Sequence, residues 1–257
     1  MKINLKNPLF IFGVGALLVA GSFLGATNAA GTPTREKVEF KTVQIGVELQ
    51  EDISTDSEES NYVKVDGDGA LVLKSLDAVK DGSEIMEPGN LYPERVRVVN
   101  NSPTDGEAPE YVRVVVRKYW IDDSGNKDTR IDPSVIQLLA TDDWGGVASP
   151  SGEEVIYYCK KPINKGESSQ VIESVSFEKD IEKYLYLMKA TQTTTRTDTE
   201  EGIIIESFRT YGGQKFVVEM KVDAVQAHGA EQAMLGAWGV NAKFEGDILK
   251  SIDGKTL

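Results

Sequence analysis

Short runs of alternating apolar and polar residues recur along the chain, and they restrict it to one class of fold. In YVRVVVRKYW, Tyr111–Trp120, the residues Val112, Val114 and Val116 share one face of an extended strand. Similar runs predict further strands at Val38–Leu49, Glu94–Val99, Ser134–Ala140, Glu154–Lys161, Gln170–Phe177, Tyr184–Thr191 and Lys215–Ala227. Turn-forming residues such as Pro88 and Gly89 separate them. The pattern predicts an all-β fold, an antiparallel sandwich.

Helical signals are few. Only Ala230–Trp238 and Phe177–Leu185 have the composition of short helices. The stretch Ile53–Gly69 is acidic and rich in Ser, Asp and Gly, so it predicts a solvated loop or a hairpin. We therefore expect these helices to be short additions to the sandwich and not a separate helical domain.

The N-terminus reads MKINLKNPLFIFGVGALLVAGSFLGATNAAGT, with two lysines, an uncharged stretch Pro8–Ala26 and then small residues. This order predicts a cleavable signal helix over residues 1–30, followed by a single β-sandwich domain over residues 31–257. The apolar stretch is long enough for an uncleaved membrane anchor as the alternative, although its five Gly and Ser residues lower its hydrophobicity. Cleavage leaves a protein that is secreted and has no membrane segment.

Charge excludes two classes of partner. The net charge is −13, and removal of the signal peptide takes away two lysines and no acid. Nucleic acid and anionic lipid are poor partners for such a surface. Cys159 is the only cysteine, so no intrachain disulfide can form, and its strand-like context predicts a small, partly buried side chain.

The chain lacks the residues of the common catalytic sites. His228 is the only histidine, so a zinc motif of the HExxH type is excluded, and no G-x-S-x-G sequence supplies a serine nucleophile. No glycine-rich loop leads from a strand into a helix, so nucleotide binding is unsupported. We expect no enzymatic activity and no cofactor, and we interpret His228 as a surface or strand-end residue.

One loop has a partial calcium-binding pattern. In DDSGNKDTRID, the residues Asp122, Ser124, Asn126 and Asp128 alternate as calcium ligands do. The loop has no Gly at the sixth position and no Glu at the twelfth. The alternatives are a weak calcium site and a polar hairpin turn, and the turn is the interpretation we favour.

Several segments, taken in order, match one known family. They are EPGNLYPERVRVVNNS (Glu87–Ser102), YVRVVVRKYW, DPSVIQL (Asp132–Leu138), DDWGG (Asp142–Gly146), EVIYYCKKPINKGESS (Glu154–Ser169) and the closing VDAVQA…AWG. Together they resemble the TasA/camelysin (CalY) family of exported Gram-positive proteins processed by SipW-type signal peptidases. The acidic insertion Ser54–Ser60, the loop Thr191–Gly202 and Cys159 depart from the family pattern.

The resemblance implies a jelly-roll subunit of an extracellular fibre or biofilm matrix. Its partners would be copies of itself, other matrix or cell-wall proteins, and a SipW-type peptidase during export. The resemblance also implies that Val222 and Val225 pack inward and that Trp238 closes one end of the sandwich. The alternative is a monomeric cell-surface adhesin or binding module. Camelysin relatives have been labelled metalloproteases, but the zinc ligands are missing here.

The resemblance further implies donor-strand exchange, in which the N-terminal segment of one subunit completes the sheet of the next. Gly31–Lys37 is polar and contains a proline, whereas Val38–Leu49 has an apolar face. The alternative is that Val38–Leu49 pairs only within its own subunit. We place the flexible donor segment at residues 31–40 and the intrachain strand at Lys41–Leu49. The assembly residues are then Gly31, Thr32, Pro33, Thr34, Val38 and Phe40.

Overall fold

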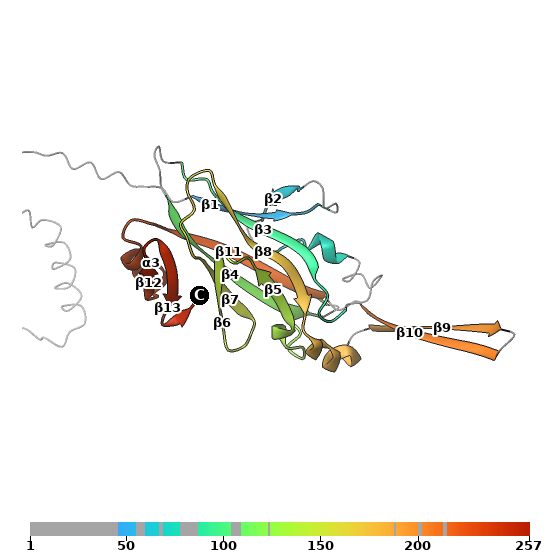
Figure 1. Ribbon diagram of the computed structural model, residues 1–257. Coiled ribbons are helices and arrows are strands. Elements are labelled where there is room, and N and C mark those ends of the chain that lie inside the picture. The colour runs from blue at the N-terminus through green and yellow to red at the C-terminus, as the bar shows by residue number, and fades with distance from the viewer. Residues whose placement is uncertain are drawn as a thin grey trace, which may run out of the picture. The chain divides into compact units, whose positions relative to one another are not determined.

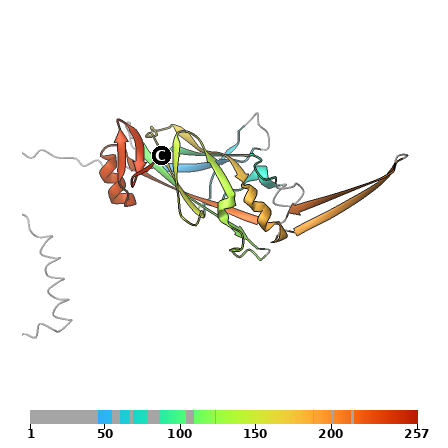
Figure 2. The same cartoon turned by 60° about the horizontal axis from the view of Figure 1, so that its bottom comes forward.

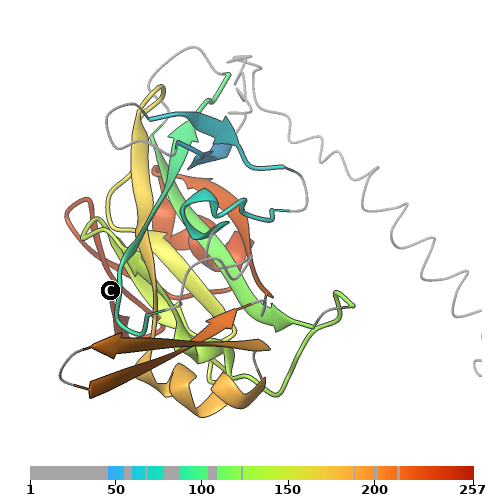
Figure 3. The ribbon, with the colours of Figure 1, turned by 90° about the vertical axis from the view of Figure 1, so that its right-hand side faces the viewer.

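Two antiparallel sheets pack face to face in the computed structural model (Figures 1 and 3). The structure describes residues 46–54, 60–66, 69–77, 87–103, 109–122, 124–187, 189–199, 202–212 and 215–257. One sheet has the order β2-β1-β3-β8-β5 and the other β11-β4-β7-β6. The predicted all-β sandwich is confirmed. The predicted signal peptide and donor segment lie outside the described residues.

Seven of the nine sandwich strands overlap the predicted runs, whereas the strands at Tyr62–Lys64 and Trp144–Ala148 were not predicted. The five-stranded sheet consists of β1 (Val47–Asp52), β2 (Tyr62–Lys64), β3 (Tyr92–Asn100), β8 (Ser168–Phe177) and β5 (Ile136–Ala140). The four-stranded sheet consists of β11 (Lys215–Gln226), β4 (Glu110–Ile121), β7 (Glu154–Cys159) and β6 (Trp144–Ala148). The chain crosses between the sheets after β3, β4, β5, β7 and β8, which is the jelly-roll-like path that brings distant strands together.

The core lies between the two sheets. Val112, Val114 and Val116 of β4 are at most 1% exposed, which confirms the predicted inward face of this strand. Trp120 packs against the rings of Phe177 and Phe216 at centroid distances of 6.3 and 5.5 Å. Because these rings come from three strands in two sheets, they hold one end of the sandwich together.

The C-terminal part forms a second, smaller core (Figure 2). Helix α3 (Ala230–Trp238) and the three-stranded sheet of β12 (Ala242–Glu245), β13 (Ile248–Ile252) and β14 (Lys255–Thr256) contribute to it. Val225 is buried in this second core, on the opposite face of β11 from Val222, so the prediction that both pack into the sandwich is wrong for Val225. Trp238 packs on Tyr158 there and does not close the sandwich itself.

The segment between the last two sandwich strands also differs from expectation. The predicted strand Tyr184–Thr191 is wrong over its first half, because a 3₁₀ helix, η3 (Lys179–Leu187), continues to Leu187. Strand β9 (Lys189–Thr199) follows, and with β10 (Gly202–Gly212) it forms a two-stranded sheet of its own. The predicted short helix at Phe177–Leu185 corresponds to η3. Two further 3₁₀ turns are η1 (Lys74–Leu76) and η2 (Pro133–Val135). Across the described ranges, none of the helices has the length and apolar character needed to cross a membrane.

Candidate functional site: an open sheet edge beside a groove

A sandwich of two open sheets exposes edge strands, which here are β2 and β5 in one sheet and β11 and β6 in the other. Unpaired backbone groups on an edge can accept a further strand, so the way each edge is closed indicates where another chain can bind. Two edges offer little. Strand β2 has only three residues. Strand β6 presents Gly146 and Ala148, which are exposed but so small that an added strand would gain few side-chain contacts there.

The edge of β5 is closed by side chains from the opposite sheet. The Lys118 ammonium donates a hydrogen bond to the carbonyl oxygen of Ile136, and the Tyr157 hydroxyl donates one to that of Leu138 at 3.0 Å. Alternate residues of an antiparallel edge strand turn their polar groups away from the sheet, and these two carbonyls are such groups. Strand β5 is therefore a poor acceptor.

The buried Lys118 leads to a prediction about pH. Burial lowers its pKa from 10.5 to about 8. Between these values the unfolded chain binds more protons than the folded chain, so the free energy of unfolding rises with pH. Above about pH 9 Cys159 opposes this rise, because burial raises its pKa from 9.0 to about 11 and the unfolded chain loses its proton first. We expect a gain of about 1 kcal/mol between about pH 8 and 9, and none above.

Urea unfolding across this pH range measures the effect. The Lys118→Met variant, which keeps a similar volume and removes the titrating group, should lose the rise. An identical rise in that variant would show that another group causes it.

The edge of β11 is half closed and half open. Leu71 N–H donates to the Val218 carbonyl at 2.9 Å, and Met220 N–H donates to the Gly69 carbonyl at 2.7 Å. The segment Gly69–Leu73, which we call the strap, thus occupies the edge as far as Met220. Val222 and Ala224 turn their backbone groups to the same side, and within the described ranges nothing pairs with them there.

A groove lies beside this open edge, between β1 and β11. Its volume is about 290 Å³. Its lining comes from the start of β1, the segment after β2, the strap and β11: Val47, Glu48, Leu49, Lys64, Val65, Asp66, Gly69, Met220, Lys221, Val222 and Asp223. Val47, Val65 and Val222 are only half-buried, although they pack against the core. The groove thus offers three half-buried valines among five charged residues, beside unpaired backbone groups with which an added strand can pair.

The described chain begins at Gly46, next to this groove. Gly46 N–H donates to Ser102 Oγ at 3.2 Å and to Glu110 Oε1 at 3.4 Å, and its carbonyl accepts from Asn101 N–H at 2.8 Å. Ser102 and Glu110 are at most 1% exposed. These contacts fix the position of Gly46 at the start of the described domain. The predicted assembly residues Gly31, Thr32, Pro33, Thr34, Val38 and Phe40 all precede this point and lie outside the described residues.

The candidate calcium residues are engaged with other groups. Asp122 Oδ1 accepts from Ser124 N–H at 2.8 Å and from Asn126 N–H at 2.9 Å. Asp128 forms an ion pair with Arg130, in which Arg130 Nη2 lies 2.7 Å from Asp128 Oδ2. Among the described parts of the chain, no three His, Cys, Asp or Glu side chains are grouped as metal ligands. This geometry favours the polar hairpin turn over a calcium site.

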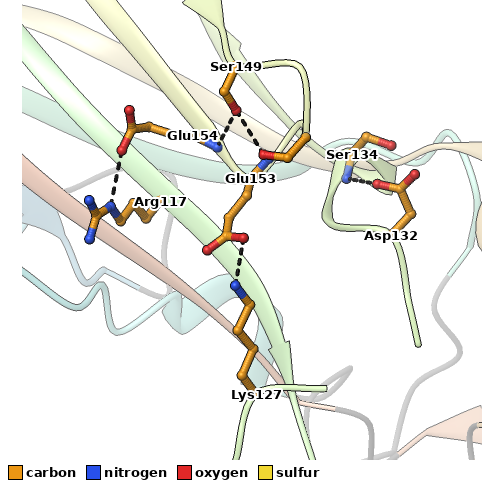
Figure 4. A network of polar contacts seen from close by, with 8 residues as sticks. Arg117, Lys127, Asp132, Ser134, Ser149, Glu153 and Glu154 are labelled. Atoms are coloured by element: carbon orange, nitrogen blue, oxygen red, sulfur yellow. Dashed lines mark hydrogen bonds and ion pairs between the residues drawn. The ribbon is translucent and has the colours of Figure 1, made fainter. Parts of the chain in front are cut away.

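The polar groups next to this hairpin pair with one another in the same way (Figure 4). Lys127 reaches Glu153 at 2.6 Å, and Arg117 reaches Glu154 at 3.1 Å. All four side chains are at least 30% exposed, so each pair contributes little to stability. The network is a solvated surface and positions no reactive group.

His228 and Cys159 lie in two different environments. His228 is exposed in the turn before α3. Cys159 is 3% exposed, and its raised pKa leaves it a thiol at neutral pH. Both fit the structural interpretation drawn from the sequence.

The groove was not foreseen from the sequence. The alternation in β11 correctly puts Val222 and Ala224 on the core face, but it does not reveal that the cover ends at Met220. The one signal in the sequence is that the apolar alternation of β11 continues past Met220 to Val222 and Ala224, which indicates that something packs along the whole strand. Comparison of the chain with protein-family models, curated proteins and solved structures finds no match.

Proposed function

We propose that this protein is a secreted structural subunit of an extracellular fibre or biofilm matrix that assembles by donor-strand exchange. The observation that carries the proposal is the open edge of β11 at Val222 and Ala224 beside the groove. The donor is the segment of residues 31–40 of another copy. The proposal assigns no catalysis and no cofactor to the chain.

Three features support this function. The export signal and the resemblance to the TasA/camelysin family suggest an extracellular matrix role. Of the three other edges, β2 is short, β5 is blocked and β6 offers few side-chain contacts, so head-to-tail addition at β11 is the favoured contact. Such a heterologous contact repeats without closing, which produces a filament.

The test is removal of residues 31–40 from the mature chain. We expect a cooperatively folding monomer that no longer forms fibres, because the described core is untouched while the donor is lost. Electron microscopy and size-exclusion chromatography measure assembly, and thermal unfolding measures the fold. Fibres from the truncated protein would contradict donor-strand exchange.

A matched pair of full-length variants controls for chain length. Val38→Ser with Phe40→Ser should abolish fibres, whereas Thr32→Ser with Thr34→Ser should leave them unchanged. Wild-type protein that stays monomeric under all salt, pH and seeding conditions would instead support the adhesin or binding module.

A further inference from the structure

The strap that covers the first half of the β11 edge is built to stay in place. Glu51, which is 1% exposed, accepts hydrogen bonds from Val72 N–H at 2.8 Å and Leu73 N–H at 2.7 Å. Leu73 adopts a left-handed conformation with φ 53°, and both Leu73 and Leu76 are buried. Displacing the strap would expose both leucines to water, which is unfavourable. An added strand therefore cannot pair with β11 before Val222.

The acceptor edge also has a far limit. Strand β11 ends at Gln226, and the exposed turn at His228 and Gly229 leads from it into α3. The available edge is thus Val222–Gln226. It admits a strand of five residues whose alternate side chains face Val222, Ala224 and Gln226 on the core side.

The charges on the outer face of this edge select the partner. Lys221 and Asp223 point outward from β11, and Asp223 is paired with Arg113 at 3.0 Å. Directly opposed like charges on neighbouring strands are unfavourable. A segment that puts an acid opposite Asp223, or a base opposite Lys221, is therefore rejected.

We infer that the strap and these charges select Val38–Thr42 of a second copy, paired antiparallel with Gln226–Val222 so that Lys41 faces Asp223. The inference rests on the proposed function, and it moves the pairing part of the donor from residues 31–40 to Val38–Thr42 at the same groove. In this register Val38, Phe40 and Thr42 face the core.

Neighbouring registers are worse. A shift of two residues one way puts Glu39 opposite Asp223 and Lys41 opposite Lys221. The same shift the other way turns Gln44 toward the core and leaves Val43 opposite Asp223. A slip of one residue turns Lys41 and Glu39 inward.

Disulfide mapping tests the register. Position 223 would form a non-hydrogen-bonded pair with its partner, so cysteines at 41 and 223 come within bonding distance. Lys41→Cys and Asp223→Cys proteins are mixed, assembled and oxidised, so that only a link between two chains can join the two introduced cysteines. The buried Cys159 does not compete. The matched control mixes Glu39→Cys with Asp223→Cys, since residue 39 lies on the same face two positions away.

We expect cross-linked dimers from the 41–223 mixture and their loss in the 39–223 mixture. Fibres whose links are equal in both mixtures, or stronger at 39–223, would overturn the register. Fibres without any link would overturn the choice of segment. A double variant, Lys41→Cys with Asp223→Cys, that links only within one chain would overturn the second copy as the partner. Absence of both fibres and links would instead contradict the proposed function.

Discussion

Val114→Asp is expected to prevent folding. Val114 is 0% exposed at the centre of β4, between β11 and β7, so an aspartate there would place an unpaired charge between the two sheets. Burial of an ionised carboxylate without a partner costs several kcal/mol, which is comparable with the whole stability of a domain. Loss of the cooperative thermal transition and of dispersed NMR resonances would show the effect.

The neighbouring residue supplies the control. Val115 lies on the opposite face of the same strand, is half-buried and pairs with Lys221 across the β4–β11 ladder. Val115→Asp should cost about 1 kcal/mol or less, since the new carboxylate reaches solvent and a lysine. If both variants failed to fold, a charge anywhere on β4 would be destabilising, and burial on the inward face would not be the cause.

Glu51→Ala is expected to lower the free energy of unfolding by about 3–6 kcal/mol, from the loss of two hydrogen bonds to a charged acceptor. Both bonds are short, and they hold the strap whose Leu73 and Leu76 complete the core. For a chain of this size the melting temperature should fall by about 10 °C or more. Calorimetry and urea unfolding measure the change.

Glu48→Ala is the matched control on the same strand. Glu48 pairs with Lys64 at 3.1 Å, but the lysine side chain is 72% exposed. Such a surface pair contributes about 0–1 kcal/mol. Equal losses in the two variants would mean that the strap does not depend on its contact with Glu51.

Much of the sandwich could be predicted because strand periodicity is a local property. The inward face of β4, the end of β11 and the short helix α3 all follow from residue order within one element. The strand predicted at Tyr184–Thr191 is wrong over its first half because its alternation is too short to distinguish a strand from a 3₁₀ turn. The acidic Ile53–Gly69 stretch predicted a solvated loop or a hairpin, and the structure shows that β2 within it pairs with β1.

The contacts that define the candidate site could not be predicted in this way, because they join residues far apart in the chain. Glu51 is an acidic residue near an acidic loop, and only the arrival of the strap makes it a buried acceptor. Lys118 continues the inward phase of β4, yet its role at the β5 edge depends on the opposite sheet.

The sequence by itself determined the class of fold and which residues of each strand share a face, since these depend on composition and spacing. The tertiary structure decided which edges are closed and which is open. Val222 and Val225 show the difference: both are apolar residues of one strand, but the second core covers Val225, whereas the strap ends before Val222 and no other described residue pairs with its edge. Edge closure depends on chain segments that meet only after folding, and that is the physical reason no local pattern records it.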